Sequence, residues 1–254
     1  MSDEIQKVPG AGGTPMAPGA PSRFGQKFQQ AAQMVTSPME IPRVFHQLVV
    51  FLLDGSGSMT AAGRTGRTKG KELHDAMTKV LERLQASRNK NCFDISCRVY
   101  STEEKAIFPQ QPVTQITLDK WSFDPLDHIE ADGTYGATSL EAAFEEAKTY
   151  LRNRTDKQSN ALIILLTDGD FHDEDEVAEI ASRIRAHPGV SLATIFYETE
   201  LTEEWEELVG ADYNEVCAAV LRGMATEEAD FASTVDPEAI RNHMIKSISR
   251  TSQV

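Results

Sequence analysis

Two stretches of the chain are almost uniformly hydrophobic, and they indicate where its central strands lie. Residues Gln47–Asp54 read QLVVFLLD, and residues Ala161–Asp168 read ALIILLTD. Both runs are short and rich in branched side chains, which is typical of strands that are buried on both faces of a sheet. The pattern therefore predicts two interior strands of one sheet.

Segments with helical periodicity alternate with these strands. Apolar residues recur at helical spacing in four places: Lys71–Leu84, from just after Ser139 to Leu151, Val177–Ile184 and Pro237–Ile248. Further strands are predicted at Phe93–Tyr100 and Ser191–Glu198, with a short edge strand within Phe108–Leu118. This alternation predicts a doubly wound α/β fold, in which helices flank a mostly parallel central sheet.

The first 44 residues differ in composition from the rest of the chain. The segment Val8–Ser22 consists mostly of Gly, Pro and Ala, and it offers few side chains that a core could bury. We therefore expect a disordered Gly/Pro-rich tail over residues 1–44 and one folded domain over residues 45–254.

Charge and hydropathy exclude several classes of protein. The chain of 254 residues has a formal net charge of −14, which is the wrong sign for binding nucleic acid. No apolar run reaches the roughly 18 residues of a membrane span, and the N-terminus has no apolar signal segment. We expect a cytoplasmic protein without membrane contact. The cysteines Cys92, Cys97 and Cys217 follow no metal-binding spacing, so we expect them to be buried and reduced.

Oxygen-bearing side chains follow both hydrophobic runs. The first run leads into DGSGSM, which provides Asp54, Ser56 and Ser58, and the second ends at Asp168 in TDGD. Between them, Thr138 lies at the start of a predicted helix in GATSL. Hydroxyl and carboxylate oxygens are ligands that Mg²⁺ and Mn²⁺ prefer and that zinc prefers less. These five residues are therefore predicted to form a site for Mg²⁺ or Mn²⁺.

The same motifs resemble the metal-ion-dependent adhesion site, or MIDAS, of von Willebrand factor A (VWA) domains. The resemblance covers about residues 45–249. It implies that Ser56, Ser58 and Thr138 touch the metal, and that Asp54 and Asp168 act directly or through water. A protein partner would supply an Asp or Glu to the open position of the metal. The usual GGT is GAT here, and Thr134 in DGTY is a rival for the role of Thr138.

The resemblance implies a non-enzymatic, Mg²⁺-dependent protein-binding module. Three features, namely the Met after DGSGS, the short GATSL form and the ending VDPEAIRNHMIKSIS, resemble bacterial cytoplasmic VWA domains, including the TerY-like proteins of tellurite-resistance and stress gene clusters, more than integrins. That similarity implies a stress-response or defence complex. The partners would be kinases, phosphatases or AAA+ ATPases, and self-association of this chain is a further expectation.

The alternative function is a Mg²⁺-dependent phosphohydrolase of Rossmann-like fold, because two carboxylates at strand ends could also serve phosphoryl transfer. Two features argue against it. Ser56 stands where a haloacid-dehalogenase-like site has a second aspartate, and no lysine follows Asp168 in TDGDFHDEDE. A serine hydrolase is disfavoured because Ser56 lacks the GxSxG context and an evident His and Asp pair.

Other charged residues have simpler interpretations. The acids at 170 and 173–176 fit a helix N-terminus, with His172 facing solvent. The basic loop 63–71 either flanks the metal or is a solvated loop. Residues 198–238 hold thirteen acids against one base, Arg222. This segment is either a solubilising surface or a docking site for a basic partner or a second copy of the chain.

Overall fold

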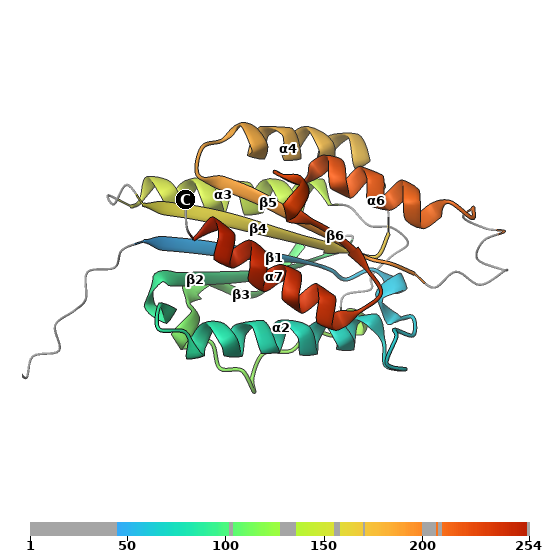
Figure 1. Cartoon of the computed structure of the whole chain (residues 1–254), viewed down its shortest axis with the longest axis horizontal. Coiled ribbons are helices and arrows are strands. Elements are labelled where there is room, and N and C mark those ends of the chain that lie inside the picture. The colour runs from blue at the N-terminus through green and yellow to red at the C-terminus, as the bar shows by residue number, and fades with distance from the viewer. Residues whose placement is uncertain are drawn as a thin grey trace, which may run out of the picture. The chain divides into compact units, whose positions relative to one another are not determined.

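The computed structural model describes residues 45–101, 104–127, 136–154, 158–169, 171–199, 207 and 210–252. These residues form a six-stranded sheet in the order β3-β2-β1-β4-β5-β6 (Figure 1). All neighbouring strands are parallel except β2 and β3, which pair antiparallel at one edge. The expected doubly wound α/β fold is confirmed.

The elements have the following bounds. The strands are β1 (His46–Asp54), β2 (Phe93–Tyr100), β3 (Glu104–Pro112), β4 (Ser159–Thr167), β5 (Val190–Tyr197) and β6 (Phe231–Thr234). The α-helices are α2 (Lys69–Ala86), α3 (Ala137–Arg152), α4 (Glu174–Ala186), α6 (Tyr213–Met224) and α7 (Pro237–Thr251). Short 3-10 helices lie at Gly57–Thr60 (η1), Lys90–Cys92 (η2), Val113–Gln115 (η3), Pro125–Asp127 (η4) and Glu228–Asp230 (η5).

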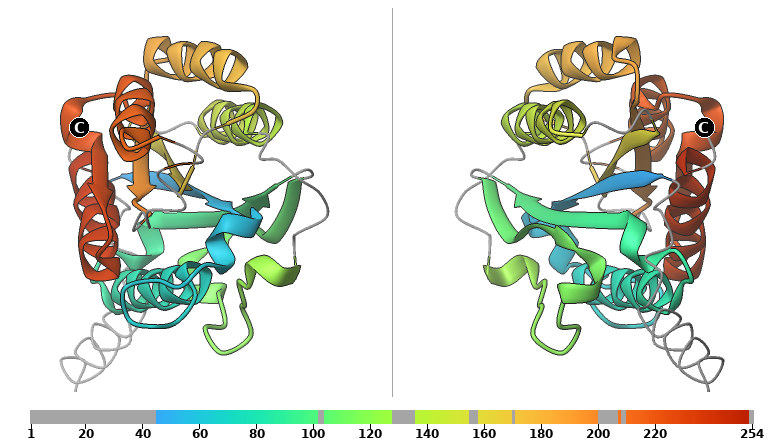
Figure 2. Two further views of the ribbon diagram at one scale, coloured as in Figure 1. Left: turned by 90° about the vertical axis from the view of Figure 1, so that its right-hand side faces the viewer. Right: turned by 90° about the vertical axis from the view of Figure 1, so that its left-hand side faces the viewer.

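Helices cover both faces of the sheet (Figure 2). Side chains alternate between the faces along a strand. Val49, Phe51 and Leu53 of β1 therefore pack towards α2 and α7, whereas Leu48 and Leu52 pack towards α3, α4 and α6. Every residue of β1 is buried, which explains why its sequence lacks polar alternation.

The structure refines several predicted boundaries. Helix α2 begins at Lys69, and helix α3 begins at Ala137 rather than after Ser139. The edge strand ends at Pro112, and a 3-10 helix follows it, so only part of the stretch Phe108–Leu118 is strand. Helix α6 and strand β6 were not predicted, and both lie within the acidic segment 198–238.

Tyr100, at the end of β2, fixes the two strand ends that lead into the predicted site. Its backbone carbonyl accepts a hydrogen bond from Gly55 N at 2.8 Å, in the loop after β1. Its buried hydroxyl group donates to the carbonyl of Leu166 at 2.9 Å, near the end of β4. Tyr100 thus holds the loops after β1 and β4 in position relative to each other.

Other expectations have separate outcomes. The predicted tail, residues 1–44, lies outside the described residues, so that boundary stays a prediction. Cys92, Cys97 and Cys217 are buried and free of disulfide bonds, as expected. Within the described part of the chain, no helix is long and apolar enough to span a membrane.

Replacing Tyr100 with phenylalanine tests whether the hydrogen bond from its hydroxyl group to Leu166 stabilises the fold. The substitution Tyr100→Phe removes one buried hydrogen bond and leaves the apolar ring in place. We expect the free energy of unfolding to fall by about 1–2 kcal/mol, measured by urea denaturation. The control Thr117→Val changes an exposed hydroxyl group and should leave the midpoint unchanged. Equal midpoints for Tyr100→Phe and wild type would argue against a stabilising role of this hydrogen bond.

Candidate metal centre

Hydrogen bonds join three of the predicted ligands into a continuous chain of oxygen atoms. The Ser56 and Ser58 hydroxyl oxygens lie 2.8 Å apart. Ser58 Oγ donates to Asp168 Oδ1 at 2.6 Å, across 110 residues of sequence. Ser58 is exposed and Asp168 is buried, so this chain of oxygens runs from the surface to the end of the sheet.

Asp54 lies behind the chain of oxygens and holds the loop that carries Ser56. Asp54 Oδ1 accepts a hydrogen bond from Ser56 N at 2.8 Å, and Oδ2 accepts one from Thr167 Oγ1 at 2.6 Å. The carboxyl group is buried, and burial is the main reason why the pKa of Asp54 rises to about 6, with the charge of Asp168 second. A cation placed beside these two carboxylates would favour their charged forms.

Thr138 lies on a different element from the other predicted ligands. It is the second residue of α3, and its side chain is exposed. Within the described part of the chain, no hydrogen bond joins Thr138 to Ser56, Ser58 or Asp168. Its rival Thr134 lies outside the described residues. The structure therefore brings Asp54, Ser56, Ser58 and Asp168 together, while the role of Thr138 stays a prediction.

The start of α3 is held by a carboxylate from another loop. Asp173 Oδ1 accepts from Gly136 N at 2.9 Å, and Asp173 Oδ2 accepts from Ala137 N at 2.8 Å. Asp173 precedes α4 but makes no side-chain cap on α4 itself. The acids at 173–176 lie at the N-terminus of α4, as expected. The side chain of Asp173 also caps the start of α3 and fixes the backbone next to Thr138.

Close packing also restricts this helix start. A Cβ atom on Gly136 would lie 2.6 Å from the ring of Phe171, which is closer than real contacts allow. The ring of Phe171 faces that of Tyr100, with their centres 6.1 Å apart. Gly136 is therefore needed for close approach, and its absent side chain lets α3 begin against the loop after β4.

A buried lysine completes the centre. Lys69 Nζ donates to Asp168 Oδ2 at 2.7 Å, and the side chains are 3% and 0% exposed, respectively. A solvated loop was one reading of residues 63–71, and it fails for Lys69, although Arg64, Arg67 and Lys71 are exposed. The sequence argument that Asp168 lacks a nearby lysine was also wrong, because the lysine comes from the start of α2.

The donor set fits a hard divalent cation. Ser58 Oγ is an oxygen within hydrogen-bonding distance of both Ser56 Oγ and Asp168 Oδ1. The described residues contain no cluster of three or more His, Cys, Asp or Glu side chains that could hold a metal. A site made of hydroxyl groups and few carboxylates suits Mg²⁺ or Mn²⁺ better than zinc.

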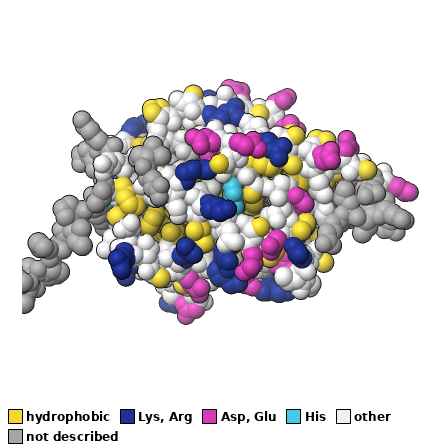
Figure 3. Space-filling view, in the orientation of Figure 1, with side chains coloured by type: hydrophobic (Ala, Val, Ile, Leu, Met, Phe, Trp, Pro, Cys, Tyr) yellow, Lys and Arg dark blue, Asp and Glu magenta, His cyan; other side chains and the backbone are white. Residues whose placement is uncertain are grey.

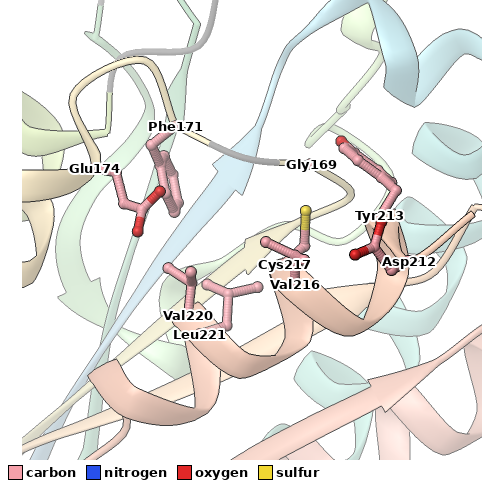
Figure 4. Close-up of a pocket in the computed structure, with 9 residues that line it drawn as sticks. All are labelled: Gly169, Phe171, Glu174, Asp212, Tyr213, Val216, Cys217, Val220 and Leu221. Atoms are coloured by element: carbon pink, nitrogen blue, oxygen red, sulfur yellow. The ribbon is translucent and has the colours of Figure 1, made fainter. Parts of the chain in front are cut away.

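A cavity of about 220 Å³ lies next to the centre, between the loop after β4 and helix α6 (Figure 4). Gly169 and Phe171 line one side, and Tyr213, Val216 and Cys217 of α6 line the other. Gly169 directly follows Asp168, so the cavity adjoins the candidate metal centre. Phe171 therefore contributes both to the cavity wall and to the packing at the start of α3.

The remaining charged residues have mixed outcomes. His172 is exposed, as expected, and Asp170 lies outside the described residues. The segment 198–238 is more than a charged surface, because Asp230 is buried and forms an ion pair with Arg250 of α7. Acidic and basic side chains are interspersed on the face that Figure 3 shows.

Sequence reasoning missed Lys69, Thr167, Asp173 and Tyr100 as parts of the centre. Thr167 directly precedes Asp168, so a polar residue at the end of a buried strand was a usable signal. Lys69 gave no local signal, because it stands among bases that stay exposed. Tyr100 and Asp173 act through contacts between elements that sequence spacing does not reveal.

Comparisons with known proteins place the fold in a known family. Residues 49–239 match the model of the von Willebrand factor type A domain. No curated protein sequence matches the chain. Many solved structures share the fold, and three of them illustrate the range of proteins that do.

These three relatives are distant in sequence. Proximal thread matrix protein 1 from the mussel byssus, with a zinc-occupied MIDAS motif, is 16% identical with a TM-score of 0.54, and the match covers 82% of this chain and 46% of that one. The pilus adhesin SpaC from Lactobacillus rhamnosus GG is 11% identical with a TM-score of 0.61, covering 82% and 31%. The conserved hypothetical protein BatB from Bacteroides thetaiotaomicron is 14% identical with a TM-score of 0.55, covering 82% and 100%.

The chain spans about half the length of the mussel protein, so the likeness concerns one domain of that protein. At these identities the structural likeness shows the fold alone. The family model covers most of the chain, including Asp54, Ser56, Ser58, Thr138 and Asp168. On the fold, the order of the motifs and this match, the chain belongs to the family of von Willebrand factor type A domains.

Proposed function

We propose that this domain is a non-enzymatic module that binds a protein partner through Mg²⁺ or Mn²⁺. The chain of oxygens from Ser56 through Ser58 to Asp168 is the observation that carries the proposal. These residues, with Thr138 and Asp54 directly or through water, would hold the cation. The bound cation supplies a Lewis-acid position that accepts a carboxylate, provided by an Asp or Glu of the partner.

The position of the oxygen chain supports binding to a partner. Ser58 is exposed at the edge of the sheet, whereas Asp54 and Asp168 are buried behind it. An outside group can therefore approach from the serine side. VWA domains commonly mediate interactions between proteins, and a pilus adhesin is among the similar structures. One similar structure carries zinc at its MIDAS motif. The oxygen donors in this chain favour Mg²⁺ or Mn²⁺.

The finer expectations rest on the sequence alone. They are a cytoplasmic location, a bacterial stress-response or defence complex, and partners of the kinase, phosphatase or AAA+ ATPase class. Self-association, and the absence of nucleic-acid and membrane binding, have the same basis. Identification of the captured partner tests all of these expectations together.

The phosphohydrolase alternative gains one observation and meets one obstacle. Lys69 beside Asp168 supplies the lysine that such a site requires. Asp54, however, is 1% exposed, and both of its oxygens accept hydrogen bonds, so it offers no free oxygen to a phosphate. The binding module is therefore the better-supported function. Hydrolysis of p-nitrophenyl phosphate by the wild type, abolished in Asp54→Asn, would overturn this choice.

Removal of one serine ligand should weaken metal binding. We expect Ser58→Ala to lower the affinity for Mg²⁺ at least about tenfold in calorimetric titrations, because the cation loses an oxygen ligand. Ser122→Ala removes an exposed hydroxyl group elsewhere and should bind like the wild type. Unchanged affinity in Ser58→Ala would exclude this serine as a ligand.

Partner capture should depend on the same metal. In a pull-down from native lysate, we expect the wild type to retain a protein in Mg²⁺ and to release it in EDTA. Ser58→Ala should not retain that protein, whereas Ser122→Ala should. Retention of the same proteins by every variant, with and without EDTA, would contradict a metal-bridged interaction.

The contact between Asp173 and α3 should affect metal binding from a distance. Asp173→Asn keeps the shape of the side chain but removes its charge and one acceptor for the N–H groups of Gly136 and Ala137. We expect the affinity for Mg²⁺ to fall about three- to tenfold as the start of α3 loosens around Thr138. Asp175→Asn changes an exposed acid in the first turn of α4, two residues after Asp173, and serves as the matched control. Equal affinities in these two variants would show that the contact from Asp173 does not position a metal ligand.

A further inference from the structure

A buried lysine lies beside the metal centre, and the proposed function does not explain it. The side chain of Lys69 is 3% exposed, and its Nζ donates to Asp168 Oδ2 at 2.7 Å and to Thr199 Oγ1 at 2.8 Å. The ring centre of Tyr197 is 5.7 Å from the same nitrogen. Burial of an ammonium group is unfavourable unless the charge is paired, so these contacts are what hold Lys69 in place.

Among the described residues, Asp168 is the carboxylate that pairs with Lys69. Thr199 is itself fixed to α6, because Asn214 Nδ2 donates to its carbonyl at 2.9 Å. The nearby carboxylate of Glu72 accepts hydrogen bonds from Thr65 N at 2.6 Å and from the Tyr197 hydroxyl group. Glu72 therefore accepts hydrogen bonds from groups other than Lys69, and the ammonium group of Lys69 pairs with Asp168.

The two oxygens of Asp168 have different partners. Oδ1 accepts from Ser58 and belongs to the oxygen chain, whereas Oδ2 accepts from Lys69. Lys69 therefore leaves the serine oxygens available. A cation held by Ser56, Ser58 and Asp168 would share the Asp168 carboxylate with the ammonium group. Two positive charges at such short range in a buried site repel each other.

The charges of the groups at the centre show how Lys69 affects the binding of a cation and of an anion. Asp54 and Asp168 carry two negative charges, and Lys69 carries one positive charge. Lys69 makes this buried centre more positive by one charge than it would otherwise be, both before and after a divalent cation is added. The additional positive charge favours a further anionic group beside the loaded centre.

We propose that Lys69 is a specificity-determining residue of the centre. Its ammonium group weakens the binding of the metal alone and makes the loaded centre select an anionic group. The inference rests on the proposed function. It explains why the loaded centre would bind a carboxylate of the partner. Lys69 acts through Asp168 and is a positioning residue rather than a metal ligand.

Removal of the charge tests this inference, because it should strengthen metal binding instead of weakening it. We expect Lys69→Met to bind Mg²⁺ alone at least about tenfold more tightly than the wild type in calorimetric titrations in chloride buffer. In acetate buffer of equal ionic strength, the wild type should gain affinity for Mg²⁺, and Lys69→Met should gain less. The thermal shift between EDTA and Mg²⁺ should be larger for Lys69→Met.

Three further variants keep the test decisive. Lys69→Arg retains the charge and should bind like the wild type, and Lys69→Gln offers a second neutral side chain if the methionine variant does not fold. Lys71→Met removes an exposed charge from the same turn of α2 and should have no effect. Neutral variants that bind Mg²⁺ no more tightly than the wild type would overturn the inference, as would an equal gain in Lys71→Met. An absence of Mg²⁺ and Mn²⁺ binding in the wild type and all variants would overturn the proposed metal centre as well.

Discussion

Burial of two carboxyl groups near each other, at the ends of the neighbouring strands β1 and β4, constrains the rest of this molecule. Such a pair is unfavourable unless hydrogen bonds or positive charge offset it. Thr167 donates to Asp54, Ser58 donates to Asp168, and Lys69 pairs with Asp168 from the start of α2. The parallel sheet brings the carboxylates together, and the loops and α2 supply the groups that make their burial tolerable.

The centre is assembled from segments that are far apart in the sequence, and each segment is held by the backbone as well as by side chains. Tyr100 ties the loop after β1 to the end of β4, and Asp173 ties the loop after β4 to the start of α3. Gly136 lets Phe171 approach that helix start closely. A change in any one of these contacts therefore affects the relative positions of loops that carry predicted ligands. The centre behaves as one unit rather than as separate loops.

The sequence predicted those parts of the fold whose signal is local. The strands β1 and β4 were identifiable because uniform burial leaves uniformly apolar runs, and β2 was predicted with its observed bounds. Helix α6 was missed because it lies within the acidic segment 198–238, which was interpreted by its charge, although the helix itself contains one acid, Glu215. Strand β6 is only four residues long. Asp54, Ser56, Ser58 and Asp168 were found together through their motifs. Lys69 was not, because burial of one base among exposed ones depends on tertiary packing that no spacing encodes.

The buried cysteines have a practical consequence. Cys97 belongs to the core between the sheet and helices α2 and α7, whereas Cys217, a residue of α6, belongs to the core on the opposite face. A buried thiol reacts with an alkylating reagent only when its surroundings open. The rates at which these two thiols become labelled would therefore report the opening of each layer separately. Cys97 and Cys217 are thus native reporters of local unfolding, one for each side of the sheet.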